Sequence, residues 1–390
     1  MFHDDDTENE AISTRDASKN PSSGLQQFPC SNCGGALLFH PGSSHLKCPY
    51  CGTENEIHFD DQDDSHLKEH DLLAELEKET HQREIASEKP DAQAVQCSNC
   101  GASILIAKDR AADSCPYCAS PLVIQEAFSC KLNIQAVLPF VVNTETAQSI
   151  YRKWLGSLWF APNDFSRRAT REEALKGIYM PFWTYDAHTR TQYQGQRGDH
   201  YYVTVTRMAN ENGKMVPKQY TERRTKWSYV SGTVRVNFDD ILVPASQSLP
   251  TDLQNSLAPW QLQNTKPFRE EFLSGFVTET AQISLKDGFT VAKGRMEYGI
   301  QRAIRADIGG DEQRITHADS HYSNLTFKHI LLPLWMSAYR YNGKTYQFMI
   351  NAQTGQLAGQ RPWSIIKIAA AVLAVAGILG GLAYYAQVLG

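Results

Sequence analysis

The stretch CSNCGGALLFHPGSSHLKCPYCG, residues 30–52, holds two Cys-x-x-Cys pairs, formed by Cys30, Cys33, Cys48 and Cys51. It returns 67 residues later as CSNCGASILIAKDRAADSCPYC, residues 97–118, with the cysteines Cys97, Cys100, Cys115 and Cys118. Both copies separate their pairs by 14 residues, open with CSNCG and close with CPYC. Because the match extends beyond the cysteines, it indicates an internal duplication.

The spacing within each pair indicates a metal site. A two-residue gap turns two thiolates onto one ion, and Gly34 or Gly101 permits the tight knuckle around it. Two knuckles complete a tetrahedral shell of four thiolates with no open position, so each site is expected to be structural, and each module to unfold without metal. The sequence predicts two zinc ribbons holding two structural Zn²⁺ ions. An iron–sulfur or redox site stays an alternative, although paired knuckles with Gly and Pro favour zinc.

The segments around the ribbons are acidic. We expect a disordered acidic tail over residues 1–25, ribbon 1 over 26–59, an acidic helical linker over 60–94 and ribbon 2 over 95–128. In the linker, leucines recur at roughly a helical period among charged residues, which predicts a solvated helix ending near Pro90.

Charge argues against one common use of zinc ribbons. Residues 1–130 contain 9 Lys and Arg against 23 Asp and Glu, a balance of −14, whereas the rest of the chain is at +9, with 29 against 20. A nucleic-acid-binding ribbon is expected to be basic, because phosphate neutralisation supplies most sequence-independent affinity. The start, MFHDDDTENE, lacks a secretory signal, and metal-type cysteine spacing fits a reducing compartment, so we expect a cytosolic location for this part.

Residues 132–361 are expected to form an α+β domain. Helical patterns are found at 144–160 and near 279–305, strands at 200–208 and 225–238, and a hairpin turns at Asn342-Gly343 with type I′ residues. Within this domain IYMPFW, residues 178–183, resembles ILLPLW, residues 330–335, which is weak evidence for a second internal duplication.

The C-terminus predicts a transmembrane helix over residues 365–388. Nineteen residues from Ile368 to Ala386 carry no charge, which is about the length that spans a bilayer core. Arg361 and Lys367 precede this stretch and no Lys or Arg follows, so the positive-inside rule keeps the preceding chain in the cytoplasm. We expect a tail-anchored protein of the inner, cytoplasmic membrane. Gly377 and Gly381 form a small-xxx-small pair through which two such helices could form a homodimer.

Other chemical motifs are weak. Gly343-Lys344-Thr345 resembles the end of a phosphate-binding loop but falls in the predicted hairpin. A metal site at His317, Asp319 and His321, with Asp311 or Glu312, is a minor alternative to solvated loop residues. Neither a nucleophile elbow nor an acid/base pair stands out, so we expect no enzyme, no catalytic residue and no cofactor-binding residue other than the cysteines.

The chain resembles a bacterial family of membrane-anchored TFIIB-type zinc-ribbon proteins, often named primosomal protein N′ (replication factor Y) helicase-like. The resemblance covers nearly everything from about residue 28 and rests on both cysteine segments, YMPFWTYDA, ADIGGDEQRI, FKHILLPLWMSAYRYNGKTYQFMINAQTG and RPWS. It implies that the eight cysteines bind zinc. It also implies a link to envelope stress, with phage-shock-protein-A-like or flotillin-like partners, and the chain contains none of the helicase motor.

These observations favour a membrane-anchored adaptor or scaffold that recruits protein partners at the cytoplasmic face of the membrane. The alternative is a nucleic-acid-binding zinc-ribbon protein of the replication-factor or helicase-associated type, against which the acidic ribbon half counts.

Overall fold

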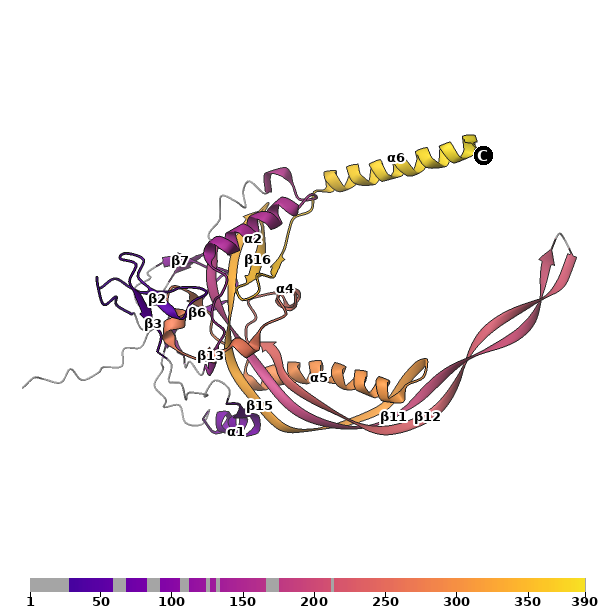
Figure 1. Cartoon of the computed structure of the whole chain (residues 1–390), viewed down its shortest axis with the longest axis horizontal. Helices are drawn as coiled ribbons and strands as arrows, with labels where there is room; N and C mark the ends of the chain where they lie inside the picture. The colour runs from indigo at the N-terminus through magenta and orange to yellow at the C-terminus, as the bar shows by residue number, and fades with distance from the viewer. Residues whose placement is uncertain are drawn as a thin grey trace, which may run out of the picture.

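The chain folds into a sheet-rich body from which two elements project to the same side (Figure 1). The computed structural model describes residues 28–58, 68–82, 92–105, 112–123, 127–130, 134–165, 175–211 and 214–389. The acidic tail predicted over residues 1–25 lies outside the described residues.

Three very long strands build the centre of a nine-stranded sheet. They are neighbours in the order β12-β11-β15, and their bounds are Lys176–Glu211 for β11, Lys214–Pro244 for β12 and Glu312–Tyr341 for β15. β11 pairs antiparallel with both others. Sequence patterns had predicted only parts of these strands, at 200–208, at 225–238 and, as the first strand of the hairpin, at 329–341.

Short strands complete the sheet around β11 and β15. They are β4 (His70–Asp71), β10 (Ala136–Val137), β13 (Lys266–Pro267), β14 (Val277–Thr278), β16 (Lys344–Asn351) and β17 (Leu357–Gly359). β15 and β16 form the predicted hairpin, and Asn342 and Gly343 both have positive φ, as a type I′ turn requires. Gly343-Lys344-Thr345 therefore belongs to a β-turn and the start of a strand.

The two similar hexapeptides lie side by side. Residues 178–183 of β11 pair antiparallel with residues 329–334 of β15. Each strand also receives a short parallel strand, β14 on β11 and β10 on β15, and each short strand leads into a capped helix. The indole nitrogens of Trp183 and Trp335 donate equivalent bonds, to Ile283 O at 3.0 Å and Val142 O at 2.7 Å. The body is thus two similar units related by an approximate twofold axis.

The capped helices are α2 (Thr144–Ser157) and α5 (Leu285–Ile308). Asn143 caps α2 by accepting from Thr146 N, and Ser284 caps α5 by accepting from Asp287 N. Buried residues recur every three or four positions along α5: Leu285, Phe289, Ala292, Met296, Ile300, Ile304 and Ile308. This face packs on the long strands, whereas the shorter elements α4 (Thr251–Ser256), η2 (Leu262–Asn264) and η3 (Glu270–Leu273) connect β12 to β14.

Beyond the pair Gly198 and Glu312, β11 and β12 continue without β15 as a two-stranded ribbon. We call this ribbon, residues 199–226, the arm; it twists and extends far from the body (Figure 1). Its side chains are largely exposed, including Tyr202 and Met215. The arm accounts for one of the two projections.

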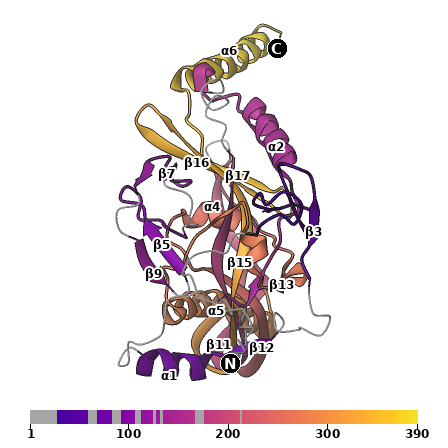
Figure 2. The same ribbon diagram turned by 90° about the vertical axis from the view of Figure 1, so that its left-hand side faces the viewer.

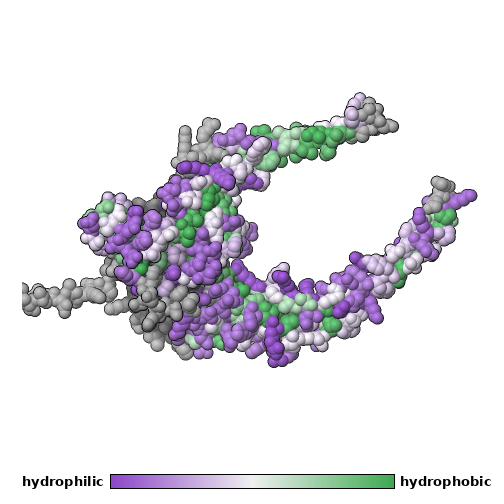
Figure 3. Space-filling view, in the orientation of Figure 1, coloured by the Kyte–Doolittle hydropathy of each residue, from purple (hydrophilic) through white to green (hydrophobic). Residues whose placement is uncertain are grey.

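The other projection is α6 (Ile365–Leu389). Its segment Ile365–Tyr385 is long and apolar enough to cross a membrane, and none of its most apolar window is buried in the protein. Figure 3 shows hydrophobic residues along α6 and mostly polar residues along the arm.

Two cysteine modules pack against the body. Cysteine module 1 comprises residues 28–58, with β1 (Leu38–Phe39), β2 (His45–Lys47) and β3 (Glu54–Glu56). Cysteine module 2 comprises residues 92–130, with β5 (Ala92–Gln96), β6 (Ser103–Leu105), β7 (Ala112–Ser114), β8 (Pro121–Val123) and β9 (Ala127–Cys130). Figure 2 shows β3 and β5 on opposite sides of the body. The two modules share hydrophobic clusters with the sheet.

The sequence had predicted that the helix of the acidic linker is solvated, but the structure buries its start. Its helix α1 (Leu72–Gln82) begins directly after β4, which pairs with β15 at Phe327 and Thr326. Leu72 is fully buried in a cluster with Trp183 and Phe327, so the start of the helix is held by the sheet. The predicted end near Pro90 lies outside the described residues.

Candidate metal centres and their docking on the sheet

The structure brings each set of four cysteines together. In module 1 Sγ of Cys30 lies 3.5 Å from that of Cys51, and Sγ of Cys33 lies 3.5 Å from that of Cys48. In module 2 the corresponding distances are 3.7 Å for Cys97 and Cys118 and 3.6 Å for Cys100 and Cys115. All four sulfurs of a set lie within 4.8 Å of one another.

These separations fit a metal ion. Metal–sulfur bonds of about 2.3 Å in a tetrahedron place the sulfurs about 3.8 Å apart. Each set also contains a thiol that ionises readily. The Thr53 hydroxyl, which lies 3.2 Å from the sulfur, lowers the pKa of Cys51 to about 5. The pKa of Cys118 is lowered to about 6, because hydrogen bonds, chiefly from Ser120, outweigh the effect of burial. In the same sets the pKa of Cys33 and of Cys100 is raised to about 12, so it is the sulfur geometry that suits both quartets to a metal.

Module 2 is docked through the tyrosine of its second knuckle, Cys115-Pro-Tyr-Cys118. Tyr117 is 1% exposed, and its hydroxyl donates to Glu279 Oε2 at 2.5 Å. Ser246 and Ser248 donate to the other carboxylate oxygen, Ser246 at 2.7 Å. Burial raises the pKa of Glu279 and, well above its usual value, that of Tyr117. A buried carboxylate with three donors is a fully satisfied polar anchor.

Further bonds join the same module to the chain around Glu279. Ile104 and Glu279 form an antiparallel bridge, and Thr280 N donates to Ser103 O at 3.0 Å. Gln282 Nε2 donates to Gly101 O at 3.1 Å, next to the first knuckle. Segment 279–282 is thus laid along β6 like an added strand.

Side chains of β16 and β11 make further contacts with module 2. Gln347 Nε2 on β16 donates to Tyr117 O at 2.7 Å, and Lys176 Nζ on β11 donates to Ser114 O at 2.7 Å. Module 2 is therefore held at both knuckles and along its strand.

Module 1 is docked differently. Phe39 N donates to Ser274 O at 3.1 Å, and Ser274 Oγ donates to Leu37 O at 2.5 Å. The Phe39 ring packs on Phe272, with centroids 5.2 Å apart. These contacts hold the middle of the module, whereas Pro49, Tyr50 and Cys51 of its second knuckle are exposed.

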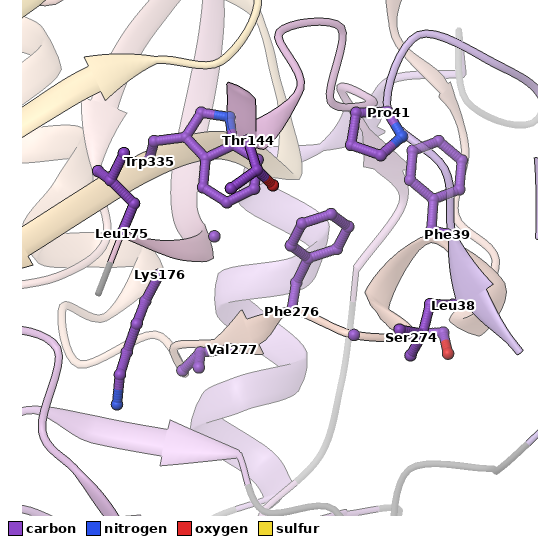
Figure 4. Close-up of a pocket in the computed structure, with 12 residues that line it drawn as sticks. Leu38, Phe39, Pro41, Thr144, Leu175, Lys176, Ser274, Phe276, Val277 and Trp335 are labelled. Atoms are coloured by element: carbon purple, nitrogen blue, oxygen red, sulfur yellow. The ribbon is translucent and has the colours of Figure 1, made fainter. Parts of the chain in front are cut away.

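A pocket of about 360 Å³ lies where module 1 meets the sheet (Figure 4). Its walls are mainly apolar, with Phe39 on the module side and Phe276 and Trp335 on the body side. Lys176 is the titratable residue of its lining, and its ammonium donates to Ser114 of module 2. Among the residues that the structure describes, the lining thus offers no acid/base pair.

The weaker sequence candidates are dispersed. His317, Asp319 and His321 lie at alternate positions of β15, exposed on one face of the sheet. Within the part of the chain that the structure describes, neither they nor Asp311 and Glu312 belong to a group of three clustered donors. Asp311 and Glu312 instead pair with the arm, where Glu312 Oε1 lies 2.8 Å from His200 Nε2.

A third cluster escaped the sequence analysis. Glu69, Asp186 and Asp239 bring carboxylate oxygens within 4.8 Å of one another. Burial raises the pKa of Asp186 to about 7, and Lys328 lies 3.6 Å from Glu69 and 3.2 Å from Asp240. Lys328 thus pairs with carboxylates at this cluster, and the ion pair to Glu69 connects the linker to the sheet. Its members are far apart in sequence, so no spacing could have revealed it.

Comparisons with known proteins give one distant relative and no assigned activity. The uncharacterized protein YdjG of Bacillus subtilis (strain 168) is 25% identical over 354 residues, which cover 90% of this chain and 94% of the relative. No family model matches the chain. No solved structure matches it either.

Proposed function

We propose that this protein is a membrane-anchored scaffold whose zinc ribbons and projecting surfaces recruit protein partners at the cytoplasmic face of the membrane. The observation that carries this proposal is α6, an apolar segment of 21 residues that the body leaves uncovered. Such a surface is costly in water and stable in a bilayer.

Zinc is the metal that suits both quartets. Zn²⁺ favours tetrahedral thiolate sites, and four protein sulfurs leave no position for a substrate. Each quartet would hold one Zn²⁺ ion in a closed structural site. The ligands are Cys30, Cys33, Cys48 and Cys51 in module 1 and Cys97, Cys100, Cys115 and Cys118 in module 2. A closed site supports recognition without catalysis, and we propose no enzymatic activity.

The charges that precede α6 support the proposed orientation. Arg361 and Lys367 lie at its start, and Lys367 Nζ donates to Trp159 O at 3.1 Å and Ala161 O at 2.7 Å. The positive-inside rule then places the body in the cytoplasm. Gly377 and Gly381 are exposed on α6, where a second copy could pack closely.

The arm constrains how α6 inserts. In Figure 1 the arm reaches further out than the end of α6 on the same side of the body. A polar two-stranded ribbon cannot enter hydrocarbon with open edges. Insertion therefore requires α6 to turn away from the arm.

Partner recruitment draws support from the surfaces left exposed and from the resemblance described above. The arm offers two open strand edges, to which a partner strand could add. The resemblance suggests phage-shock-protein-A-like or flotillin-like partners and a role in envelope stress.

The arm also favours one other candidate, nucleic-acid binding of the replication-factor or helicase-associated type. Residues 199–226 carry six Lys and Arg against three Asp and Glu, with exposed Tyr201 and Tyr202. Binding of DNA or RNA that weakens steeply with salt would support this candidate, and the absence of binding at low salt would reject it.

Affinity purification from detergent-solubilised membranes tests the scaffold, with zinc measured in the same samples. The wild-type chain is compared with the double variant Cys30→Ser and Cys33→Ser and with Cys130→Ser, which removes a cysteine outside both quartets. We expect about two zinc ions per wild-type chain and specific partners that are lost only in the double variant. Identical recovery from all three proteins would contradict the proposal.

A further inference from the structure

The two copies of the Cys-Pro-Tyr-Cys knuckle differ in what covers them. Tyr117 of module 2 is 1% exposed, whereas its counterpart Tyr50 of module 1 is 80% exposed. Pro116 and Cys118 are buried, and their counterparts Pro49 and Cys51 are exposed. The sequence of the knuckle is the same in both copies, so the difference lies in the partner surface.

The strand beside the knuckle differs in the same sense. Ser103 and Leu105 of module 2 are 6% and 5% exposed, because segment 279–282 lies along them. Their counterparts in module 1, Ala36 and Leu38, are exposed, and Leu38 is 39% exposed. Part of the face that is covered in module 2 is thus uncovered in module 1, at Ala36 and around Tyr50, whereas the backbone of Leu38 pairs with Lys47 of β2.

The segment that covers this face in module 2 therefore indicates what the equivalent face of module 1 can bind. Its occupant is the sequence Glu279-Thr-Ala-Gln282, held by the Tyr117 hydroxyl on the carboxylate, by Thr280 N on Ser103 O and by Gln282 on Gly101 O. The groups that make these bonds recur in module 1, as the hydroxyl of Tyr50 and the carbonyls of Ala36 and Gly34.

We propose that the exposed face of module 1, formed by Gly34, Ala36, Leu38 and Tyr50, docks an extended segment of a partner protein that presents a glutamate to Tyr50. This inference rests on the proposed function, whose partner chemistry it specifies. The glutamate takes the place that Glu279 holds on module 2, and the segment's other bonds go to the carbonyls of Ala36 and Gly34. The segment does not extend along β1 (Leu38–Phe39), because both edges of that strand are already bonded, to β2 and to Ser274. Tyrosine suits such an anchor, since it combines a large apolar ring with one donor.

One difference between the two copies of the knuckle leaves the Tyr50 ring of module 1 free to move. The position of Ala102 in module 2 is Gly35 in module 1, and a Cβ at Gly35 would lie 2.6 Å from the Tyr50 ring. The Tyr50 ring rests against this backbone while it is exposed. It can move outward to a carboxylate without breaking a buried contact.

The test uses the full chain in detergent and a fluorescent peptide with the sequence of residues 275–284, GFVTETAQIS. We expect saturable binding that weakens about tenfold when Tyr50 is changed to Phe, because a hydrogen bond to a charged group is lost. Changing the peptide's glutamate to glutamine should weaken binding equally, and the two changes together should cost no more than either alone. Tyr229→Phe, at an equally exposed tyrosine on β12, is the control and should bind as wild type does.

Absence of saturable binding, or binding that Tyr50→Phe leaves unchanged, would overturn the proposal. The scaffold is judged separately, by the purification experiment. If partners are recovered by wild type and by Tyr50→Phe alike, the scaffold stands and this docking face is wrong. If no specific partner is recovered while the peptide binds as expected, the docking face stands and the scaffold is wrong.

Discussion

Modules 1 and 2 place the same four-cysteine motif in two different surroundings. Their cysteines have the same spacing and nearly the same sulfur separations. Module 2 nevertheless has its second knuckle buried on Glu279, whereas module 1 presents the same knuckle to solvent. The geometry of the four cysteines alone therefore does not show whether a module's second knuckle is buried against the body or left exposed. In module 2 the chain itself supplies the carboxylate that covers the knuckle, and we propose that a partner supplies it in module 1.

The largest difference between the modules should appear when each loses its metal. Cys115→Ser removes a buried ligand beside Tyr117, so we expect it to release both the metal and the docking of module 2. Structural zinc contributes on the order of 10 kcal/mol to the folding of a small module, so the body should lose cooperative unfolding. Cys48→Ser should cost module 1 its metal but leave the thermal transition of the body. Thermal unfolding in detergent measures both, and equal loss in the two variants would show that module 1 is equally integral.

The anchoring carboxylate gives the next effect. Glu279→Ala leaves the Tyr117 hydroxyl buried without its acceptor, which should cost about 1–3 kcal/mol and lower the melting temperature by several degrees. Glu54→Ala on module 1 removes an exposed partner of Lys47, 3.1 Å away, and should leave the melting temperature unchanged. Chemical denaturation checks both values. A Glu279→Ala protein as stable as wild type would mean that Tyr117 is held by packing alone.

The rate at which a chelator removes the metal should also differ between the modules, and this effect should be smaller than the two above. Cys33 and Cys51 are exposed in module 1, whereas Cys100 alone is exposed in module 2. A chelator reaches exposed sulfurs more readily, so we expect zinc to leave in two phases, the faster severalfold quicker and assigned to module 1. The double variant Cys30→Ser and Cys33→Ser should abolish the fast phase. Release in one phase would indicate that accessibility does not control the two sites.

The sequence predicted the features that depend on local spacing. The cysteine quartets, the β15–β16 hairpin at Asn342-Gly343 and the apolar helix α6 lie where the patterns place them. Strand length was underestimated, because alternation marked only parts of β11 and β12, at 200–208 and 225–238, whereas the strands run over Lys176–Glu211 and Lys214–Pro244. The similarity of residues 178–183 to 330–335 carried more information than three identities suggest, since these segments are direct neighbours in the sheet.

The difference between the modules was not readable from the sequence. Tyr50 and Tyr117 have identical neighbours within their knuckles, and the group that buries Tyr117 lies 162 residues further along the chain. Glu279 occurs in a segment, VTETAQ, that reads as an ordinary helix start. Long-range pairing of this kind is present in only one of the two modules, and single-sequence patterns do not specify it. The burial of Leu72 under the acidic linker escaped prediction for the same reason.

One measurement tests the division of labour most directly: thermal stability and partner recovery, determined together for Tyr50→Phe and Tyr117→Phe in the full membrane-bound chain. Each variant removes one hydroxyl from the same motif. We predict that Tyr50→Phe keeps the wild-type melting temperature and loses its partners, whereas Tyr117→Phe melts at a lower temperature and, below it, still recovers them. If the two variants behave alike in both assays, or if Tyr117→Phe alone loses its partners, the modules do not have the separate roles described here.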